Sequence, residues 1–155
     1  MIRKRALTID DLNTVCHSFS DASSHDDLLF CTLLCVGFFA LMRLGELTFP
    51  DNITLRDPRK LIRRSTVRLQ PTFFQFFLPG HKADRFFEGN TIILRKNTLP
   101  CNPMHFFLLY ITSRDHQFPL SSPLWLTAAG QVPTRSFFMR RLRIWFDNNV
   151  AGQSM

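Results

Sequence analysis

Acidic side chains are scarce in the last two thirds of this 155-residue sequence. Residues 55–155 contain 5 Asp or Glu against 15 Lys or Arg, a net charge of +10. Residues 1–54 contain 7 acidic and 4 basic side chains, a net charge of −3. A positive charge concentrated in one part of a chain favours a polyanionic partner, most simply nucleic acid. The alternative is a basic surface that binds nothing specific.

Cysteine is scarce as well, with 4 in the chain, and no apolar signal-peptide core precedes them, so a disulfide-stapled secreted domain is disfavoured. Cys31 and Cys35 lie one helical turn apart in an apolar segment, where buried free thiols are common. The histidines His81, His105 and His116 show no recognisable ligand spacing. We therefore expect no metal and no other cofactor.

No apolar run is long enough to cross a bilayer comfortably. The segment Leu28–Met42 falls short of the roughly 20 residues that a membrane-spanning helix needs, and Asp26, Asp27 and Arg43 flank it closely. We therefore expect a soluble intracellular protein, in the nucleus or elsewhere in the cell, without a membrane partner.

Phenylalanine, in contrast, is abundant, with 17 copies in a chain of 45% hydrophobic content, enough for the core of one domain over residues 1–155. Capping residues followed by apolar runs predict helices. The capping residues are Thr8, Ser24, Asn102 and Thr134. The helices that they predict span residues 8–19, 25–48, 102–113 and 134–148.

The middle of the chain changes to β-forming residues. The runs "STVRL" (65–69), "FFQFFL" (73–78) and "NTIIL" (90–94) are rich in β-branched or aromatic side chains, and Gly89-Asn90 is a turn signal. These runs predict three antiparallel strands, with residues 79–90 as a long hairpin tip. The fold class is α+β, mainly helical with a small three-stranded antiparallel sheet.

Two basic side chains stand in positions where chemistry is conceivable. Arg43, within the predicted helix 25–48, shares a helical face with Val36 and Phe39, and an inward-facing guanidinium needs an anion. That anion is either Glu46, three residues later, or a bound ligand. Lys82 leads into the hairpin tip, where it is either a solvated edge residue or a proton donor to a bound ligand.

The order of these features resembles the catalytic domain of the tyrosine recombinase (phage integrase) family: a helix ending in Arg-x-x-Glu-Leu, then a three-stranded sheet with a lysine in its second hairpin. The segments "GFFALMRLGELTFPDN" and "LPGHKADRFFEGNTI" are most similar to recombinases of eukaryotic mobile elements of the Crypton type. The resemblance covers the chain from about Leu7 to Met155.

The resemblance implies roles for three residues. Arg43 would hold the non-bridging oxygens of the scissile DNA phosphate, as a planar guanidinium can with two parallel bonds. Glu46 would brace Arg43, and Lys82 would protonate the leaving 5′-oxygen. The implied partners are double-stranded DNA and further recombinase protomers, with no small-molecule substrate and no metal.

The sequence departs from the family pattern at its C-terminal end. The family continues with a His-x-x-Arg box and a tyrosine nucleophile, whereas here Gln153 stands where histidine is usual and the sequence ends at Met155. The single tyrosine, Tyr110, is interpreted as a core residue because it lies at helical spacing among apolar residues. We therefore expect a partial catalytic domain that is inactive by itself and aggregation-prone, because part of the Phe-rich core on the helix at 25–48 is left uncovered.

Basic side chains in residues 55–68, in the hairpin tip and in the last helix are expected to contact backbone phosphates. They are Arg56, Arg59, Lys60, Arg63, Arg64, His81, Arg85, Arg140 and Arg141. No base-reading signature is present. The leading hypothesis is a fragment of a DNA-breaking and -joining recombinase. The alternatives are a non-catalytic DNA-binding module derived from a mobile element and a globular scaffold without a nucleic-acid role.

Overall fold

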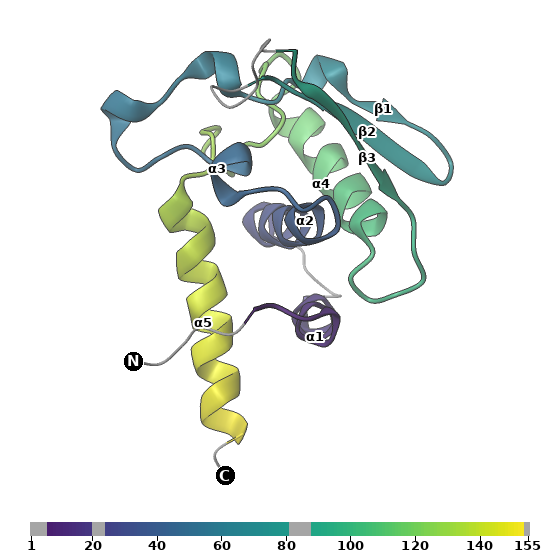
Figure 1. Cartoon of the computed structure of the whole chain (residues 1–155), viewed down its shortest axis with the longest axis vertical. Helices are drawn as coiled ribbons and strands as arrows, with labels where there is room; N and C mark the ends of the chain where they lie inside the picture. Colours follow the sequence, from purple (N-terminus) through teal and green to yellow (C-terminus); the bar gives the residue numbers. More distant parts are fainter. Residues whose placement is uncertain (1–5, 20–23, 81–87, 154–155) are drawn as a thin grey trace.

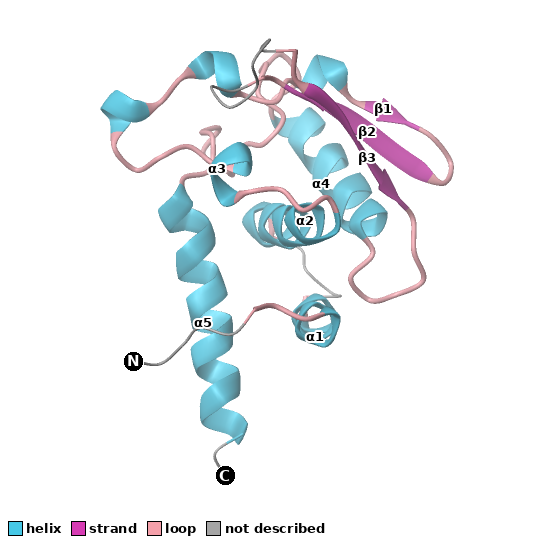
Figure 2. Ribbon diagram, viewed as in Figure 1, coloured by secondary structure: helices cyan, strands magenta, loops and turns pink. Residues whose placement is uncertain are grey.

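A computed structural model describes residues 6–19, 24–80 and 88–153, with the side chains up to residue 146. Within these ranges the fold is α+β, as predicted, with helices packed beside a three-stranded antiparallel sheet (Figures 1 and 2). The α-helices are α1 (Ile9–Ser18), α2 (His25–Phe39), α3 (Leu44–Leu47), α4 (Pro103–Gln117) and α5 (Arg135–Gln153). None of them is both long and apolar enough to cross a membrane.

The sheet consists of β1 (Arg68–Leu69), β2 (Phe73–Leu78) and β3 (Asn90–Arg95), in that order. In the β2–β3 register Leu78 pairs with Asn90 and Phe73 with Arg95, so the connection between the two strands leaves β2 at Pro79. The predicted antiparallel pairing is confirmed. The first strand is shorter than predicted, because Arg64–Thr66 form a 3-10 turn, η3, before it.

Helix α2 forms the centre of the molecule, with α1, α4 and α5 around it (Figure 1). Every residue from Leu28 to Val36 is buried, as expected for a helix that is apolar on all sides. Helix α4 lies between α2 and the sheet. There the rings of Phe107 (α4) and Phe74 (β2) stack with their centroids 4.0 Å apart.

The capping signals located the helix starts well. The side chain of Thr8 accepts a hydrogen bond from the backbone N–H of Asp11, whose carboxylate accepts one from the N–H of Thr8, a complete capping box. Ser24 and Asn102 cap α2 and α4 through a side-chain oxygen, which accepts a hydrogen bond from the backbone N–H of Asp27 and of Met104, respectively. Helix α4 continues to Gln117, beyond the predicted end at residue 113.

The prediction of one helix over residues 25–48 is wrong. Helix α2 ends at Phe39, and Leu41 adopts a left-handed backbone conformation with φ of 54°. The N–H of Met42 then bonds the carbonyl of Gly37 (3.0 Å), and the N–H of Leu41 bonds that of Phe38 (3.4 Å), a Schellman ending. Glycine usually occupies the left-handed position of this motif. A leucine there, in a continuing apolar run, gave no stop signal in the sequence.

Candidate functional site

The break after α2 changes the position of Arg43. Arg43 precedes the first residue of α3 and is exposed, so the prediction that it faces inward is wrong. The carboxylate of Glu46 accepts a hydrogen bond from the backbone N–H of Arg43 (2.7 Å). Glu46 therefore fixes the backbone at Arg43, and among the described residues no ion pair engages the guanidinium of Arg43.

A hollow of about 140 Å³ lies beside Arg43. Three parts of the chain line it: the start of α3, the 3-10 turn η2 (Pro58–Lys60), and the end of β2. The lining residues are Arg43, Gly45, Glu46, Lys60, Leu78 and Pro79. Lys60 is exposed and also has no ion-pair partner among the described residues. The hollow thus carries two cations that form no ion pair among the described residues and one carboxylate, that of Glu46, for a net charge of +1.

The predicted proton donor, Lys82, follows the end of β2 in the sequence. Lys82, with His81 and Arg85, lies outside the described residues. Pro79, three residues before Lys82, lines the hollow with Arg43. The fold therefore brings the end of β2 to the Arg43 side of the sheet.

Some of the predicted DNA-contacting arginines are engaged inside the protein. Arg64 forms a two-pronged ion pair with Asp115, with Nε–Oδ1 at 3.0 Å and Nη2–Oδ2 at 2.8 Å. The guanidinium of Arg63 donates to the Oγ of Ser122 (2.7 Å) and to the carbonyl of Pro58 (3.3 Å). These contacts fasten residues 63–64 to the segment after α4, and they occupy Arg64 more fully than Arg63.

The remaining basic side chains of this segment are more accessible. Arg56 is half-buried, donates to the carbonyls of Pro50 and Asp51, and lies over the ring of Phe49. Arg59 forms an ion pair with Asp57, but 91% of its side-chain surface is exposed. Arg59, Lys60 and Arg68, which is also exposed, are therefore the basic side chains of residues 55–68 most accessible to an external phosphate.

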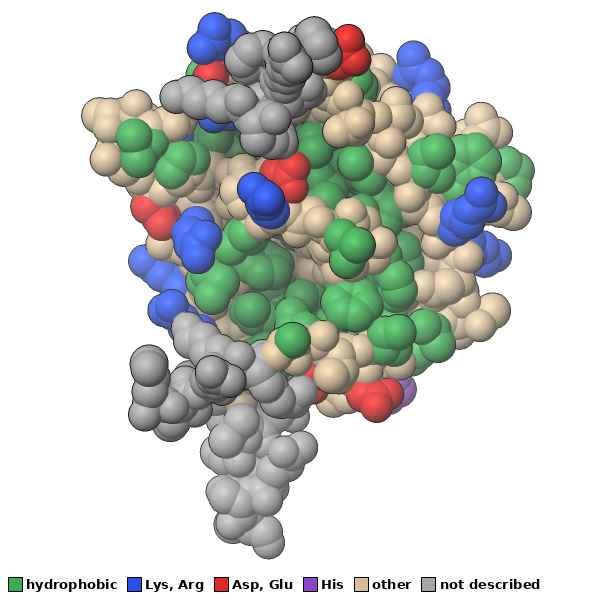
Figure 3. Space-filling model, in the orientation of Figure 1, with side chains coloured by type: hydrophobic (Ala, Val, Ile, Leu, Met, Phe, Trp, Pro, Cys, Tyr) green, Lys and Arg blue, Asp and Glu red, His purple; other side chains and the backbone are tan. Residues whose placement is uncertain are grey.

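The basic side chains of α5 also differ in whether they are engaged inside the protein. Arg141 pairs with Asp27 (2.9 Å) and lies over the ring of Phe137, so it helps to attach α5 to α2. Arg140 is exposed on the same helix. Space-filling Figure 3 shows basic side chains along the edge of the molecule beside η2 and the start of α5. Hydrophobic side chains gather in front of the end of α2.

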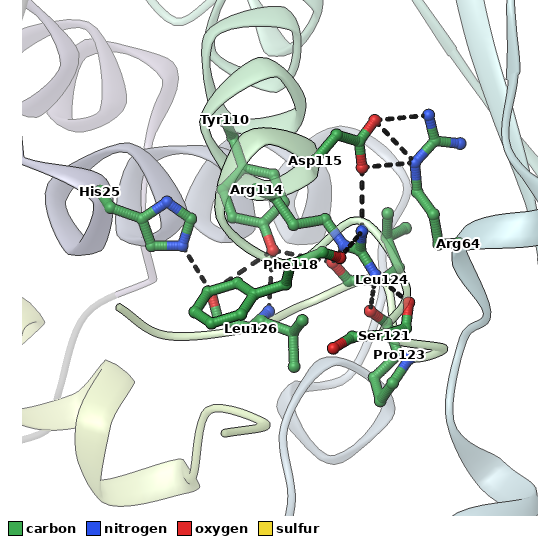
Figure 4. Close-up of polar contacts among 10 residues, drawn as sticks. All are labelled: His25, Arg64, Tyr110, Arg114, Asp115, Phe118, Ser121, Pro123, Leu124 and Leu126. Atoms are coloured by element: carbon green, nitrogen blue, oxygen red, sulfur yellow. Dashed lines mark hydrogen bonds and ion pairs between the residues drawn. The ribbon is translucent and has the colours of Figure 1, made fainter. Parts of the chain in front are cut away.

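Sequence reasoning missed the buried arginine, Arg114 on α4. Its guanidinium has no exposed surface, and Figure 4 shows how it points into the segment that follows the helix. It donates to Asp115 and to four backbone carbonyls, those of Phe118, Ser121, Pro123 and Leu124. The only signal in the sequence was its spacing, four residues after Tyr110 and three after Ile111, which places it on the apolar face of α4.

The carboxylate of Asp115 lies between two guanidinium groups. Burial raises its pKa, but the hydrogen bonds and charges of Arg64 and Arg114 outweigh burial and hold the pKa below its usual value. Arg64 and Arg114 are thus joined through one shared carboxylate (Figure 4). The arrangement is structural, since it links η3, α4 and the segment 118–126.

Tyr110 is a core residue, as predicted. Its side chain has no exposed surface, its hydroxyl donates to the carbonyl of Leu124 (2.7 Å), and the same oxygen accepts from the N–H of Leu126 (2.8 Å). Burial raises the pKa of this phenol well above its usual value. A buried hydroxyl with both roles occupied is not available as a nucleophile.

A second, larger cleft opens beside the Arg43 hollow. It has a volume of about 220 Å³ and lies between α3, residues 55–62, the Pro123–Trp125 segment and the start of α5. Gly45, Glu46 and Lys60 line both depressions, so the two adjoin. Trp125 forms part of the wall, and its buried indole Nε1 has no hydrogen-bond partner among the described residues. The rings of Phe76, Phe107 and Tyr110 pack around that indole.

Comparisons with models of known protein families, with curated protein sequences and with solved structures returned no match.

Proposed function

We propose that the hollow between Arg43 and Lys60 binds a backbone phosphate of double-stranded DNA. The observation that carries this proposal is the meeting of two exposed cations in one hollow, neither of them in an ion pair among the described residues. The segments that form the hollow are not adjacent in the sequence. Arg59 and Arg140 extend the positive surface for further phosphate contacts. Affinity from such contacts is largely electrostatic and depends strongly on salt concentration.

The chemistry of Arg43 suits this role. A guanidinium presents parallel N–H donors that match two phosphate oxygens, and Arg43 has no ion pair to break among the described residues. The hydrogen bond from its backbone N–H to Glu46 fixes the chain at Arg43 and leaves the side chain available. In this proposal Glu46 positions the backbone at Arg43, and the phosphate binds the guanidinium.

The proposed biological context is DNA recombination and integration by a tyrosine recombinase-like domain. It rests on the Arg-x-x-Glu-Leu motif and on the approach of the end of β2 to Arg43, since β2 leads to Lys82. In that context Arg43 offsets charge on the phosphate, and Lys82 donates the proton to the leaving oxygen. Further protomers of the same kind would be the protein partners.

A second candidate function is a DNA-binding module without chemistry. The burial of Tyr110 favours it for these 155 residues acting alone, because no other tyrosine occurs in the sequence. Both candidates predict DNA binding, and they differ only in covalent chemistry.

Fluorescence anisotropy with a labelled duplex of about 20 base pairs tests the proposal. The variants Arg43→Ala and Lys60→Ala are each expected to weaken binding about tenfold, which is about 1.4 kcal/mol. Each is also expected to lower the slope of log K against log salt by about one.

Arg95→Ala is the matched control. Arg95 is exposed and pairs with Phe73, at the opposite end of the hairpin from Leu78 and Pro79. Arg95→Ala removes one positive charge, as the other two variants do, but at a site away from the hollow. We therefore expect it to weaken DNA binding less than they do. Absence of duplex binding at low salt, or an equal loss in all three variants, would refute the proposed phosphate site.

A further inference from the structure

The cleft of about 220 Å³ beside the phosphate hollow has walls that are mainly apolar. Its volume lies below the roughly 300–1,000 Å³ of sites for drug-sized molecules, so its occupant is small. The apolar side chains that line it include Leu47, Phe49, Leu55, Leu61, Ile62 and Val132, beside Trp125. An apolar cleft of this size suits one small hydrophobic or flat group.

The charged side chains that line this cleft are Lys60, Arg135, Glu46 and Asp57, and with Arg59, the ion-pair partner of Asp57, their charges sum to +1. Lys60 and Arg135 line it, and among the described residues neither has an ion-pair partner. The two acidic residues of the lining already have partners. Glu46 accepts from the backbone N–H of Arg43, and Asp57 is engaged by the backbone and side chain of Arg59. The cleft therefore favours an apolar group with an anion beside it.

The cleft also continues into the phosphate hollow. Lys60 lines both, as do Gly45 and Glu46, so a ligand with its anion at Lys60 can extend an adjoining group into the cleft. A nucleotide has this construction, because a flat base with apolar faces is joined through its sugar to a phosphate.

We infer that the cleft accepts an unpaired base of the DNA strand whose phosphate lies between Arg43 and Lys60. This inference rests on the proposed function and adds to it a preference for DNA that contains an unpaired base. A base within a duplex is stacked and paired, and taking it out costs free energy. The cost is lowest where the base is already unpaired. The protein should therefore prefer a duplex with a single-nucleotide bulge over a perfect duplex of the same length.

The 3-10 turn η1 (Ile53–Leu55) offers a matched pair of variants. Ile53 is 74% exposed and Leu55 is 67% exposed, but only Leu55 lines the cleft. Leu55→Glu places a carboxylate at the cleft, where it repels a nucleotide. Ile53→Glu adds the same charge to the same turn and leaves the cleft open. Both positions are exposed enough for the fold to tolerate the change.

The experiment compares binding of a bulged duplex and a perfect duplex by anisotropy, for the unmodified chain and both variants. We expect the unmodified chain to bind the bulged duplex about tenfold more tightly. Ile53→Glu should weaken both complexes and keep this ratio, whereas Leu55→Glu should reduce the ratio to about one. A 2-aminopurine base at the bulge should change its fluorescence on binding the unmodified chain, and less on binding Leu55→Glu.

The outcomes separate this inference from the proposed function. If Arg43-dependent duplex binding occurs but bulged and perfect duplexes bind equally, the base site is refuted and the phosphate site stands. If the ratio falls equally in both variants, the cleft is not the site of the base. Absence of binding to either duplex refutes the proposed function, and the base site with it. Leu55-dependent binding of a short acidic, leucine-containing peptide, without any bulge preference, would assign the cleft to a protein partner and refute the base site.

Discussion

Arg64 and Asp115 form a two-pronged ion pair across 51 residues of sequence, with Nη2 and Oδ2 2.8 Å apart. The carboxylate also accepts a hydrogen bond from the buried guanidinium of Arg114 (2.9 Å). Through these contacts the basic segment before β1 is attached to α4 and to residues 118–126. The position of that segment, and hence of the hollow between Arg43 and Lys60 beside it, depends on side chains that do not line the hollow.

Replacement of Arg114 should destabilise the protein strongly. Arg114→Met keeps much of the side-chain volume but removes every donor, which leaves Asp115 and four backbone carbonyls without this partner. We expect a loss of about 3–5 kcal/mol in the free energy of unfolding, measured by urea denaturation. Arg143→Met on the exposed side of α5 is the control, with an expected change below about 0.5 kcal/mol. A loss below about 1 kcal/mol for Arg114→Met would contradict the structural role of Arg114.

Asp115 should make stability depend on acid pH. Its pKa in the folded protein lies below its usual value, so its contribution to stability is fully present above the unfolded pKa and is lost as pH falls through the folded pKa. Asp115→Asn removes this carboxylate. The stability difference between the unmodified chain and Asp115→Asn should therefore be largest near pH 7 and shrink below about pH 4. Urea denaturation of both proteins at several pH values measures it, and a difference independent of pH would contradict the prediction.

Leu41 should be replaceable with a gain in stability. Its φ of 54° costs a leucine roughly 1–2 kcal/mol, and its side chain is 89% exposed, so little packing is lost on removal. Leu41→Gly relieves this strain, and the relief exceeds the entropy cost of the introduced glycine. We expect a net gain of about 0.5–1 kcal/mol in the free energy of unfolding. Leu120→Gly is the control, since Leu120 is 98% exposed and is not among the described residues with positive φ. Thermal unfolding should rank Leu41→Gly above the unmodified chain and Leu120→Gly at or below it.

Tyr110→Phe should affect stability and leave DNA binding unchanged. The substitution removes a hydroxyl that satisfies the carbonyl of Leu124 and the N–H of Leu126, both buried. A loss of about 1–3 kcal/mol is expected, because those groups are left without this partner. The unmodified chain should form no covalent adduct with DNA on a denaturing gel. An adduct that disappears in Tyr110→Phe would show that Tyr110 is a nucleophile after all.

Local signals in the sequence predicted most of the elements. The capping box at Thr8 and Asp11, the caps at Ser24 and Asn102, and the β-forming runs at 73–78 and 90–94 each lie within a few residues of the structure that they specify. The burial of Tyr110 followed from its apolar neighbours at helical spacing. The DNA-binding role rests on charge distribution and on a family resemblance, and it stays a prediction.

The remaining features depend on contacts between distant segments. The helix break at Leu41 lacked the usual glycine, so no local signal marked it, and the apolar pattern continued through it. Because of this break, Arg43 lies at the surface and not in the predicted inward position. The neutralisation of Arg64 by Asp115 likewise depends on α4 packing beside η3, which no local pattern encodes.

The sequence by itself determined the fold class, the starts of α1, α2, α4 and α5, the strand pairing and the excess of positive charge, because each depends on neighbouring residues or on composition. Only the tertiary structure decided which charges remain available. Arg43 and Lys60 meet in one hollow, whereas Arg64 and Arg114 share the carboxylate of Asp115 within the protein. The physical reason is that a charge is neutralised by whatever lies within a few ångströms in space, and that distance is set by how the elements pack.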